Sequence, residues 1–317
     1  MDNPYRSLPV GPFTRQQALA AGFSSRMLQS ASFVRLFPRV WRRASHEMSE
    51  ADWVKAARLA LPADAHLTGI SLIQELGLDY GPRKPIHFVV AGDLHLAFEG
   101  VFLHRTKALA PLDEGDVCVE AAFMSYCVQC RVIDAIKVGD WLLHNQHMDL
   151  GRLEALATAQ PWRDGAYEAL WVLEHLDQDS WSLKESETRG VLVFAGLPRP
   201  ECNKQLTEIV ARAVIVDLLY RAYGVAVEFE GMQHQEERSQ YTKDLGRYGL
   251  MRAAGVPYVQ VTNEKLQRPR RLVHEVHAEL VARGYEGPPP VFGERWRSLF
   301  GSLRAAVGER DRPTKAG

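Results

Sequence analysis

Two glutamates one residue apart, Glu228 and Glu230, interrupt the apolar stretch VAVEFEG. Successive side chains of a strand point to opposite faces, so both carboxylates share one face while Val227 and Phe229 share the other. Two carboxylates on one surface repel each other, and shielding them from water is costly unless a cation lies between them. The pair therefore predicts either a divalent-cation site or a solvated acidic face.

A third acid, Asp217, interrupts the apolar run AVIVDLL, which predicts a strand. With a two-residue turn at 222–223, antiparallel pairing puts Asp217 directly opposite Glu228, with Glu230 two residues further along the same face. Like charges facing each other destabilise a hairpin, whereas oxygen ligands hold divalent cations well. The spacing predicts that three carboxylates converge on one ion. The alternative is an edge hairpin with a solvated acidic face.

Several helices and strands must surround this hairpin within residues 179–286. Ser182 begins a helix through ESETRGVLVFA, and Gly255 ends a second one in RSQYTKDLGRYGLMRAAG. PYVQVT predicts a strand and PRRLVHEVHAELVARG a last helix. The tail, residues 287–317, begins with prolines and ends polar, so we expect partial disorder with one short amphipathic helix around residues 296–303.

The first 45 residues contain the parts of a winged helix-turn-helix. FTRQQALAAGF predicts a helix that starts at Thr14 and stops at Gly22, and SSRMLQSA predicts a second short helix. FVRLFPRVWRRA predicts two strands around a turn at Pro38, which would form the wing. The alternative is a small module that docks onto another protein.

Arginines are concentrated in this region. Residues 1–50 carry seven arginines against three acids, although the whole chain has a net charge of −1. Any contact with nucleic acid should therefore be local. Arg26, near the start of the second helix, would read base edges, and the arginines of the wing would bind phosphates: Arg35, Arg39, Arg42 and Arg43.

Residues 46–178 predict a mixed α/β region that connects the two ends of the chain. Helices are expected at SEADWVKAARLAL and HLTGISLIQELGL, strands at PIHFVVAG and GVFLHRT, and further helices at 124–145, 149–159 and 164–178. The histidines of this region have no repeating ligand spacing. Cys127 and Cys130 form one C-x-x-C without a second ligand pair, which favours buried apolar packing over a zinc site.

Composition sets the broad class of protein. A chain of 317 residues favours two or three domains, and the hydrophobic share of 46% with 24% charged residues is ordinary for a globular protein. No apolar run approaches the roughly 20 residues of a membrane span, and the N-terminus lacks the order of a signal peptide. Four cysteines do not make a disulfide framework. We expect a cytoplasmic protein.

The order of several blocks resembles a known family. SLKESETR, GLPRPECN, VDLLY, VAVEFEGMQH, QYTKDLGRYGL and YVQVT, within residues 182–284, resemble an actinobacterial domain-of-unknown-function group related to the very-short-patch repair endonucleases, in the PD-(D/E)XK superfamily. The resemblance implies a restriction-endonuclease-like α/β domain over residues 179–286. HLTGISLIQELGL and the winged helix before it resemble the AbiEi-like antitoxin arrangement. That second resemblance implies a cognate toxin or another protein as a partner.

The family pattern also implies individual site residues. It identifies an acid of the first helix, an acid of the hairpin, the strand pair, a histidine after the glycine and a D-x-x-R helix: Glu185, Asp217, Glu228, Glu230, His234, Asp244 and Arg247. Two features depart from it. Glu230 stands where the family usually has Asp, and the lysine of the superfamily has no counterpart on this strand.

Structural alternatives exist for three of these residues. Glu185 follows Ser182 at the spacing of a capping box and could pair with Arg189 one turn on. His234 could be a surface histidine in a polar loop. Asp244 and Arg247 could form an ordinary ion pair on a helix.

The functional expectation is a Mg²⁺- or Mn²⁺-dependent DNA endonuclease that hydrolyses phosphodiester bonds and is targeted to DNA by its winged helix. Asp217, Glu228 and Glu230 would hold the ion. The alternative is a non-catalytic, antitoxin-like transcriptional regulator that binds DNA and uses the nuclease fold as a scaffold, because a fold does not establish chemistry.

Overall fold

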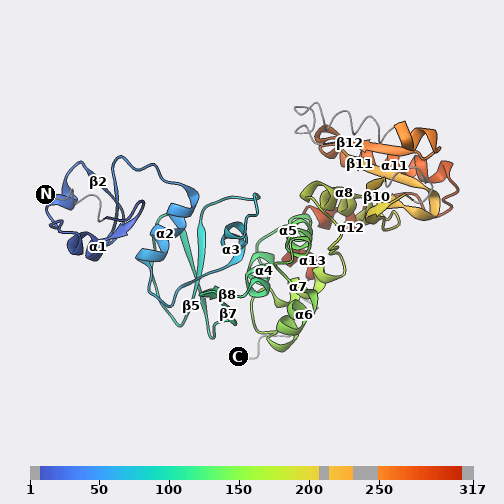
Figure 1. The fold of residues 1–317 in the computed structure, drawn as a ribbon. Coiled ribbons are helices and arrows are strands. Elements are labelled where there is room, and N and C mark those ends of the chain that lie inside the picture. Colours follow the sequence, from blue (N-terminus) through green and yellow to red (C-terminus); the bar gives the residue numbers. More distant parts are fainter. Residues whose placement is uncertain (1–7, 207–213, 231–248, 309–317) are drawn as a thin grey trace. The chain divides into compact units, whose positions relative to one another are not determined.

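The computed structural model describes residues 8–206, 214–230 and 249–308 (Figure 1). The chain forms two compact units, Met1–Ser125 and Tyr126–Gly317. Helices alternate with several small sheets, so the predicted α/β class is confirmed at this level. Within the described ranges, no helix combines the length and the apolar character that crossing a membrane requires.

The start of the first unit is a small three-stranded sheet with order β1-β3-β2. Its elements are β1 (Phe13–Thr14), α1 (Arg15–Ala20), the 3-10 helix η2 (Met27–Gln29), β2 (Phe33–Phe37) and β3 (Val40–Arg43). The predicted helix start at Thr14 is correct: its hydroxyl accepts from the Gln17 backbone N, and the Gln17 side chain accepts from the Thr14 N. The second predicted helix is only the single turn of η2.

The rest of the first unit is a second, mixed sheet with order β4-β5-β6, in which β5 and β6 are parallel. Helix α2 packs against the first sheet and α3 against β5. The elements are α2 (Glu50–Ala60), β4 (His66–Leu67), α3 (Gly69–Glu75), β5 (Ile86–Ala91), β6 (Val101–Thr106), β7 (Leu112–Asp113), β8 (Asp116–Val117) and α4 (Val119–Cys127), which runs past the end of this unit.

The second unit begins with a group of packed helices. They are α5 (Val132–His144), α6 (Leu150–Ala159), α7 (Ala166–Leu173), α8 (Leu183–Phe194), α12 (Glu294–Leu299) and α13 (Leu303–Val307). The single helix expected over 124–145 is two helices, α4 and α5, with a break before the extended N-cap residue Arg131. Helices α12 and α13 come from the tail. They are ordered because Trp296, Leu299, Leu303 and Val307 are buried against the other helices.

A four-stranded mixed sheet in the second unit carries the predicted site. Its order is β12-β11-β10-β9, in which β9, β10 and β11 are antiparallel while β11 and β12 are parallel. The elements are β9 (Glu201–Gln205), β10 (Ile215–Tyr220), β11 (Val225–Phe229), β12 (Tyr258–Val261), α10 (Asn263–Leu266) and α11 (Pro269–Ala282). Helices α8 and α11 pack against this sheet (Figure 1).

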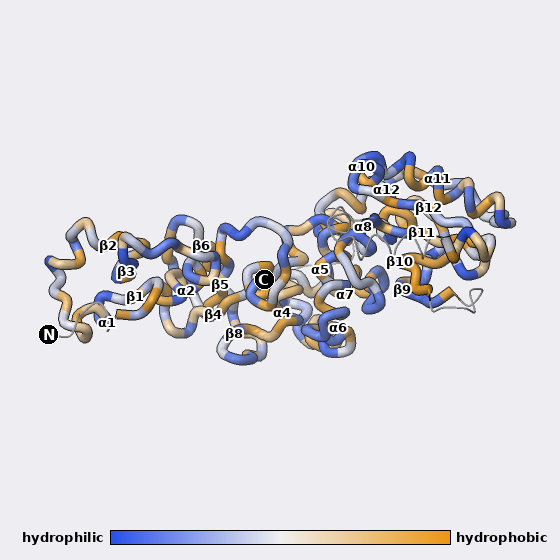
Figure 2. Tube along the Cα trace, turned by 45° about the horizontal axis from the view of Figure 1, so that its top comes forward, coloured by the Kyte–Doolittle hydropathy of each residue, from blue (hydrophilic) through white to orange (hydrophobic). Residues whose placement is uncertain are grey.

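Hydrophobic residues line β10 and β11 (Figure 2) and are mostly buried. One core cluster joins Val216 of β10 and Ala226 of β11 to Met251, in the helical segment that follows residue 248. Charged side chains are therefore exceptions on these two central strands, and each needs a physical reason.

Candidate functional site

The hairpin of β10 and β11 has the register that the sequence predicts. Leu218 pairs with Val227 and Tyr220 with Val225, so the next pair outward is Asp217 with Glu228. The turn differs from the predicted two-residue loop, because η3 (Arg221–Tyr223) is a 3-10 turn that Gly224 closes with a φ of 60°. The register is the same because both turns reverse the chain around the same midpoint.

Both carboxylates of this pair bind backbone amides of the opposite strand. Asp217 N donates to Glu228 Oε1 at 3.1 Å, and Phe229 N donates to Asp217 Oδ2 at 2.7 Å. Side chains thus replace ladder hydrogen bonds where the two strands begin to diverge. These bonds fix the direction of each carboxylate.

Burial separates Glu228 from its neighbours. Its exposed fraction is 0%, whereas Asp217 and Glu230 are only partly buried. Removing a carboxylate from water costs free energy, and a second carboxylate facing it adds repulsion. Glu228 is therefore the residue of this sheet whose charge is hardest to explain by surface solvation, and the predicted solvated face does not describe it.

Two carboxamides extend this polar pair into a row across the whole sheet. Asn203 of β9 occupies the position facing Asp217, between the pairs Val216–Lys204 and Leu218–Cys202. Gln260 of β12 faces Glu228 in the parallel ladder. The row therefore reads Asn203, Asp217, Glu228, Gln260, with carboxylates on the two inner strands and carboxamides on the two outer ones.

Glu230 lies beside this row and is held by one of its members. The Gln260 side-chain Nε2 donates to Glu230 Oε2, and Glu230 N donates to the Val261 carbonyl at 2.8 Å. The side chain of Glu230 is thus directed to the outer strand β12. This contact explains why Glu230 does not join the other two carboxylates.

Glu185 is held at the other end of the row. Its Oε2 accepts from Asn203 Nδ2 at 2.6 Å and from Trp181 N at 2.9 Å, while its own N donates to the Ser182 hydroxyl at 3.1 Å. Only 8% of the residue is exposed. These contacts close the N-terminus of α8 and favour the structural role. The pair with Arg189 does not form, because Arg189 binds Asp140 at 2.6 Å.

The carboxylates do not assemble into the predicted three-ligand group. Within residues 8–206, 214–230 and 249–308, no set of three or more His, Cys, Asp or Glu side chains is placed to hold a metal ion. The donor chemistry of Asp217 and Glu228 nevertheless fits Mg²⁺, because this ion keeps several waters and is usually bound by one or two carboxylates. His234, Asp244 and Arg247 lie outside the described residues.

Neighbouring groups that could act as nucleophiles are kept neutral. Burial raises the pKa of the Cys202 thiol well above its usual value, and burial also raises the pKa of the Tyr220 hydroxyl. A thiol with a raised pKa forms little thiolate at neutral pH and reacts slowly. The raised pKa values therefore disfavour attack by either group at neutral pH.

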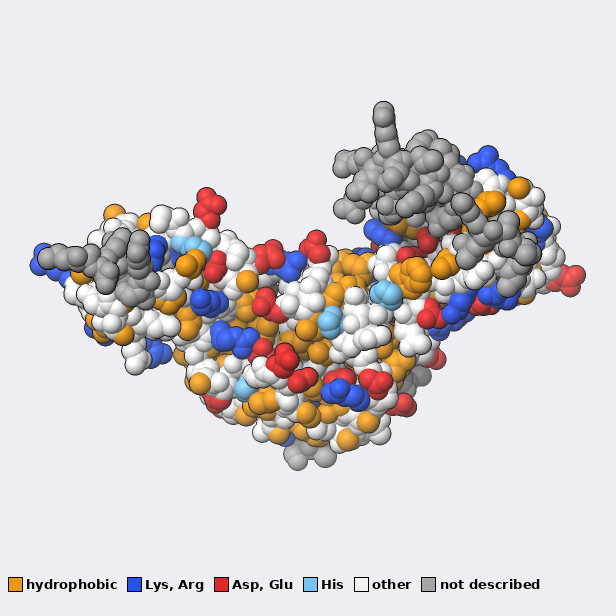
Figure 3. All heavy atoms as spheres, in the orientation of Figure 1, with side chains coloured by type: hydrophobic (Ala, Val, Ile, Leu, Met, Phe, Trp, Pro, Cys, Tyr) orange, Lys and Arg blue, Asp and Glu red, His pale blue; other side chains and the backbone are white. Residues whose placement is uncertain are grey.

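Three of the five predicted DNA-binding arginines are exposed in the first unit. Arg26 precedes η2, and Arg35 and Arg39 belong to the hairpin of β2 and β3, where Arg39 is in the turn with a φ of 66°. Figure 3 shows several Lys and Arg side chains at the surface near the N-terminal elements. Exposure leaves these three guanidinium groups accessible to phosphates.

The remaining two arginines are used within the fold. Arg42 Nη1 donates to the carbonyls of Arg43, Ala44 and His46 at 3.0, 3.0 and 2.7 Å. Arg43 Nη2 donates to the Leu8 carbonyl at 3.2 Å. Both side chains are partly buried. They stabilise the chain that leaves β3, so their guanidinium groups are less available to a ligand than that of the exposed Arg39.

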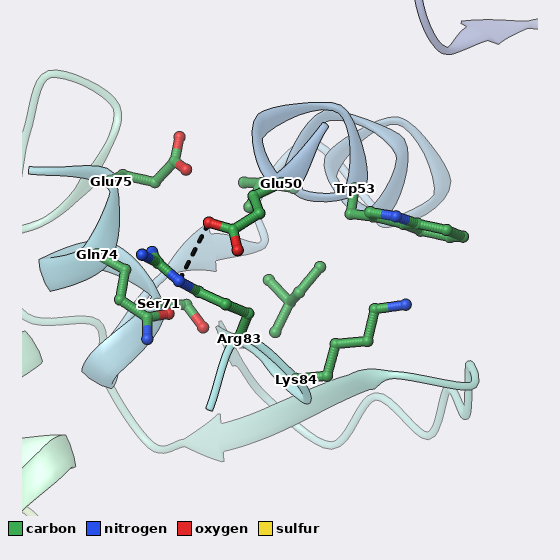
Figure 4. Close-up of a pocket in the computed structure, with 9 residues that line it drawn as sticks. Glu50, Trp53, Ser71, Gln74, Glu75, Arg83 and Lys84 are labelled. Carbon is green, nitrogen blue, oxygen red and sulfur yellow. Dashed lines mark ion pairs between the residues drawn. The ribbon is translucent and has the colours of Figure 1, made fainter. Parts of the chain in front are cut away.

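A cavity of about 240 Å³ in the first unit is a second place where charged groups meet (Figure 4). Both cations at its edge contact neighbouring side chains: Arg83 pairs with Glu50 at 3.1 Å, and Lys84 Nζ lies 3.8 Å from the centre of the Trp53 ring. These contacts satisfy the cations at its edge. The cavity combines acids, cations and an indole without a matched nucleophile and base, so we do not assign chemistry to it.

Sequence reasoning missed Asn203 and Gln260. The segment ECNKQ has no apolar alternation, so β9 was not expected and Asn203 had no position in the sheet. Gln260 could have been found, because Val259 and Val261 flank it and place it on the opposite face of PYVQVT, together with Tyr258 and Thr262.

Searches among protein-family models, curated proteins and solved structures found no match to this chain. The resemblance to the very-short-patch repair group therefore remains a hypothesis based on the residue blocks quoted above.

Proposed function

We propose that this protein is a metal-dependent DNA endonuclease-like hydrolase of phosphodiester bonds. The observation that carries the proposal is the pair of carboxylates from Asp217 and Glu228, which face each other across the two central strands while Glu228 is fully buried. A buried acid beside a second acid is unfavourable for folding alone, and binding a divalent cation offsets that cost.

Asp217 and Glu228 would hold the ion through their carboxylate oxygens. Bound Mg²⁺ or Mn²⁺ supplies an activated water and neutralises charge on the phosphate. The amide hydrogen bonds from the opposite strand orient both carboxylates before any ligand arrives, which lowers the cost of ordering them. The resemblance gives His234 a role in proton transfer, and it gives Asp244 and Arg247 a role in bracing the site or binding a phosphate oxygen.

The first unit would deliver the protein to DNA. Arg26, Arg35 and Arg39 are exposed around one small sheet, and exposed guanidinium groups bind phosphates without selecting a sequence. The short η2 turn replaces a full second helix. We therefore propose phosphate binding by the β2–β3 hairpin as the main contact, and base reading by Arg26 as the lesser one.

A second candidate function is a non-catalytic DNA-binding regulator. One observation favours it: the described part of the chain holds no group of three metal-ligating side chains, and Asp217 and Glu228 already bind amides within the sheet. In this case the carboxylates would only close the diverging end of the hairpin, and the protein would bind DNA without cutting it.

Plasmid cleavage separates the two functions. The full-length chain is incubated with supercoiled plasmid DNA and Mg²⁺ or Mn²⁺, with EDTA as the metal-free control. If the protein is a nuclease, we expect wild type to nick the plasmid. Asp217→Asn should lower the nicking rate by orders of magnitude, because this substitution removes a ligand charge while keeping the side-chain volume. Asp164→Asn, an exposed acid of the same unit, is the matched control and should cleave like wild type. DNA binding without any cleavage would support the regulator.

A further inference from the structure

The cavity of the first unit has an uncharged polar wall, which α3 supplies. Ser71 and Gln74 line it, and their exposed fractions are 4% and 9%. The Ser71 hydroxyl oxygen accepts from His87 N at 3.0 Å. Gln74 Nε2 donates to the carbonyls of Tyr80 and Pro82 at 2.8 and 3.3 Å. These bonds hold both side chains in one orientation before a ligand arrives.

The same bonds leave one donor and one acceptor on this wall. Ser71 uses its oxygen, so its hydroxyl hydrogen can donate, and Gln74 uses its nitrogen, so its Oε1 can accept. Neither of these two groups has a partner within residues 8–206, 214–230 and 249–308. Figure 4 shows the Gln74 oxygen on the side of Ser71. A donor beside an acceptor matches the Watson–Crick edge of a nucleobase, where an N–H group stands next to a carbonyl or a ring nitrogen.

The other walls suit a flat ring. Val54 and Ile86 supply apolar surface and Trp53 supplies an indole. Lys84 also lines the cavity, and its ammonium covers one face of the indole at 3.8 Å (Figure 4). An exposed contact between a cation and an aromatic ring is weaker than the stacking of a base on that ring. A base can therefore take the place of the ammonium.

The charges and the size of the cavity favour a small, uncharged ligand group. Its charged lining residues cancel, because Glu50 and Glu75 oppose Arg83 and Lys84. The Glu50 side chain is 64% exposed, so its pair with Arg83 adds little stability and can yield to a ligand. The volume of about 240 Å³ lies just below the range of roughly 300–1,000 Å³ that holds drug-sized ligands. This volume suits a single base whose sugar stays outside.

We propose that this cavity binds a nucleobase, which stacks on Trp53 in place of the Lys84 ammonium and places its Watson–Crick edge against Ser71 and Gln74. The base belongs to a free nucleoside or to an unpaired nucleotide of a DNA strand. The site binds and makes or breaks no bond. It goes beyond the proposed function, because it lies in the unit without the β10–β11 carboxylates and needs no metal.

The test measures the affinity of the full-length chain for each of the common deoxynucleosides by calorimetry. Trp53→Leu removes the stacking surface and should weaken binding about 10-fold to 100-fold. Trp162→Leu, at a tryptophan that is 50% exposed in the second unit, is the matched control and should bind like wild type. The melting temperature of both variants should be that of wild type.

A lysine variant should change affinity in the opposite direction. Lys84→Ala removes the ammonium that competes for the indole, so the base should bind about 2-fold to 5-fold more tightly. Lys107→Ala, at an exposed lysine of the same unit, should leave affinity unchanged. A merely structural role of the Lys84–Trp53 contact would not produce tighter binding. If Trp53→Leu does not fold, Lys84→Ala decides the question, and weaker binding by this variant would overturn the proposal.

The ligand can be varied to test the polar wall without changing the protein. The tightest-binding deoxynucleoside is compared with its analogue methylated at the ring nitrogen of the Watson–Crick edge. The methyl group blocks the contact with Ser71 or Gln74 and should weaken binding about tenfold. Equal affinity for the two compounds would overturn the assignment of this wall.

A short single-stranded oligonucleotide of the same base distinguishes the two sources. If it binds more tightly than the nucleoside and Trp53→Leu removes that difference, the base comes from DNA. If the nucleoside binds as tightly as the oligonucleotide, the ligand is the free nucleoside. No binding of any deoxynucleoside at millimolar concentration, or equal binding by wild type and a folded Trp53→Leu variant, would overturn the proposal. Neither result would affect the proposed metal-dependent cleavage.

Discussion

The two hairpins that carry the candidate residues place their charges in opposite surroundings. In the β2–β3 hairpin of the first unit, Arg35 and Arg39 are exposed to solvent. In the β10–β11 hairpin of the second unit, Asp217 is partly buried and Glu228 is fully buried. Both hairpins are short and antiparallel, so the difference lies in the charged residues and not in the type of element.

This difference in burial decides how strongly a charged residue indicates a function. An exposed arginine loses little hydration on folding, so its presence needs no ligand and is compatible with a surface that binds nothing. A buried carboxylate beside another carboxylate costs stability, so it is retained for a structural bond or for a ligand. Burial therefore makes the β10–β11 hairpin the more informative of the two.

The largest expected effect concerns the support beneath the β10–β11 hairpin. Arg189 of α8 pairs with Asp140 of α5 at 2.6 Å, with exposed fractions of 2% and 0% for the two side chains, and α8 packs against β10 and β11. Asp140→Ala leaves a buried guanidinium without its carboxylate and should lower the free energy of unfolding by about 3–5 kcal/mol. Urea unfolding measures this loss.

Hydrogen exchange on the same variant tests the contrast between the hairpins. Amides of β10 and β11 should lose protection, while those of β2 and β3 should keep theirs. Asp164→Ala, at an exposed acid, is the control and should be neutral. A loss below about 1 kcal/mol for Asp140→Ala, the level of a surface pair, would contradict the account.

A divalent cation should stabilise one hairpin and not the other. Mg²⁺ or Mn²⁺ at a hundredfold excess over its dissociation constant should add about 2.7 kcal/mol of stability, because the ion binds the folded state. Differential scanning calorimetry measures the rise in melting temperature. Asp217→Asn should abolish that rise, and Arg39→Ala should keep it. A rise that survives Asp217→Asn would place the ion elsewhere in the chain.

The smallest effects should divide the arginines of the first unit. Replacing Arg26, Arg35 and Arg39 together by Ala should reduce the slope of log affinity for duplex DNA against log salt by about 0.9 for each lost phosphate contact. Arg42→Ala should instead cost about 1–3 kcal/mol of stability, because three carbonyls lose their donor. Salt-dependent fluorescence anisotropy and urea unfolding measure the two effects. An unchanged slope in the triple variant would contradict the proposal that these arginines bind DNA phosphates.

Some structural features of the two units could be predicted from local patterns in the sequence. The cap at Thr14 and the facing pair of Asp217 and Glu228 were predictable, because capping residues and hairpin register depend on neighbours close in the chain. A tail helix was expected around residues 296–303, where α12 lies, but its burial was not predictable, since Trp296 and Leu303 pack against helices far away in sequence.

The candidate site was predictable only in part for the same reason. The expected convergence of three carboxylates failed because Glu230 binds Gln260, which belongs to a strand 30 residues further along the chain. Asn203 could not be predicted as part of the site either, because its strand is polar and gives no periodic signal. Side-chain hydrogen bonds between distant strands decide where such acids point, and residue spacing does not record them.

The most direct test of the central claim is metal-dependent cleavage by wild type and by Glu228→Gln. The substitution keeps the volume of the buried side chain and removes its charge, so cleavage of plasmid DNA in Mg²⁺ or Mn²⁺ should fall by orders of magnitude. DNA binding, measured on the same preparations, should persist because the exposed arginines of the first unit are unchanged, and Glu286→Gln, at an exposed glutamate, should cleave like wild type. Equal cleavage by wild type and Glu228→Gln, or DNA binding with no cleavage by either, would contradict the claim that the buried carboxylate serves a metal-dependent nuclease.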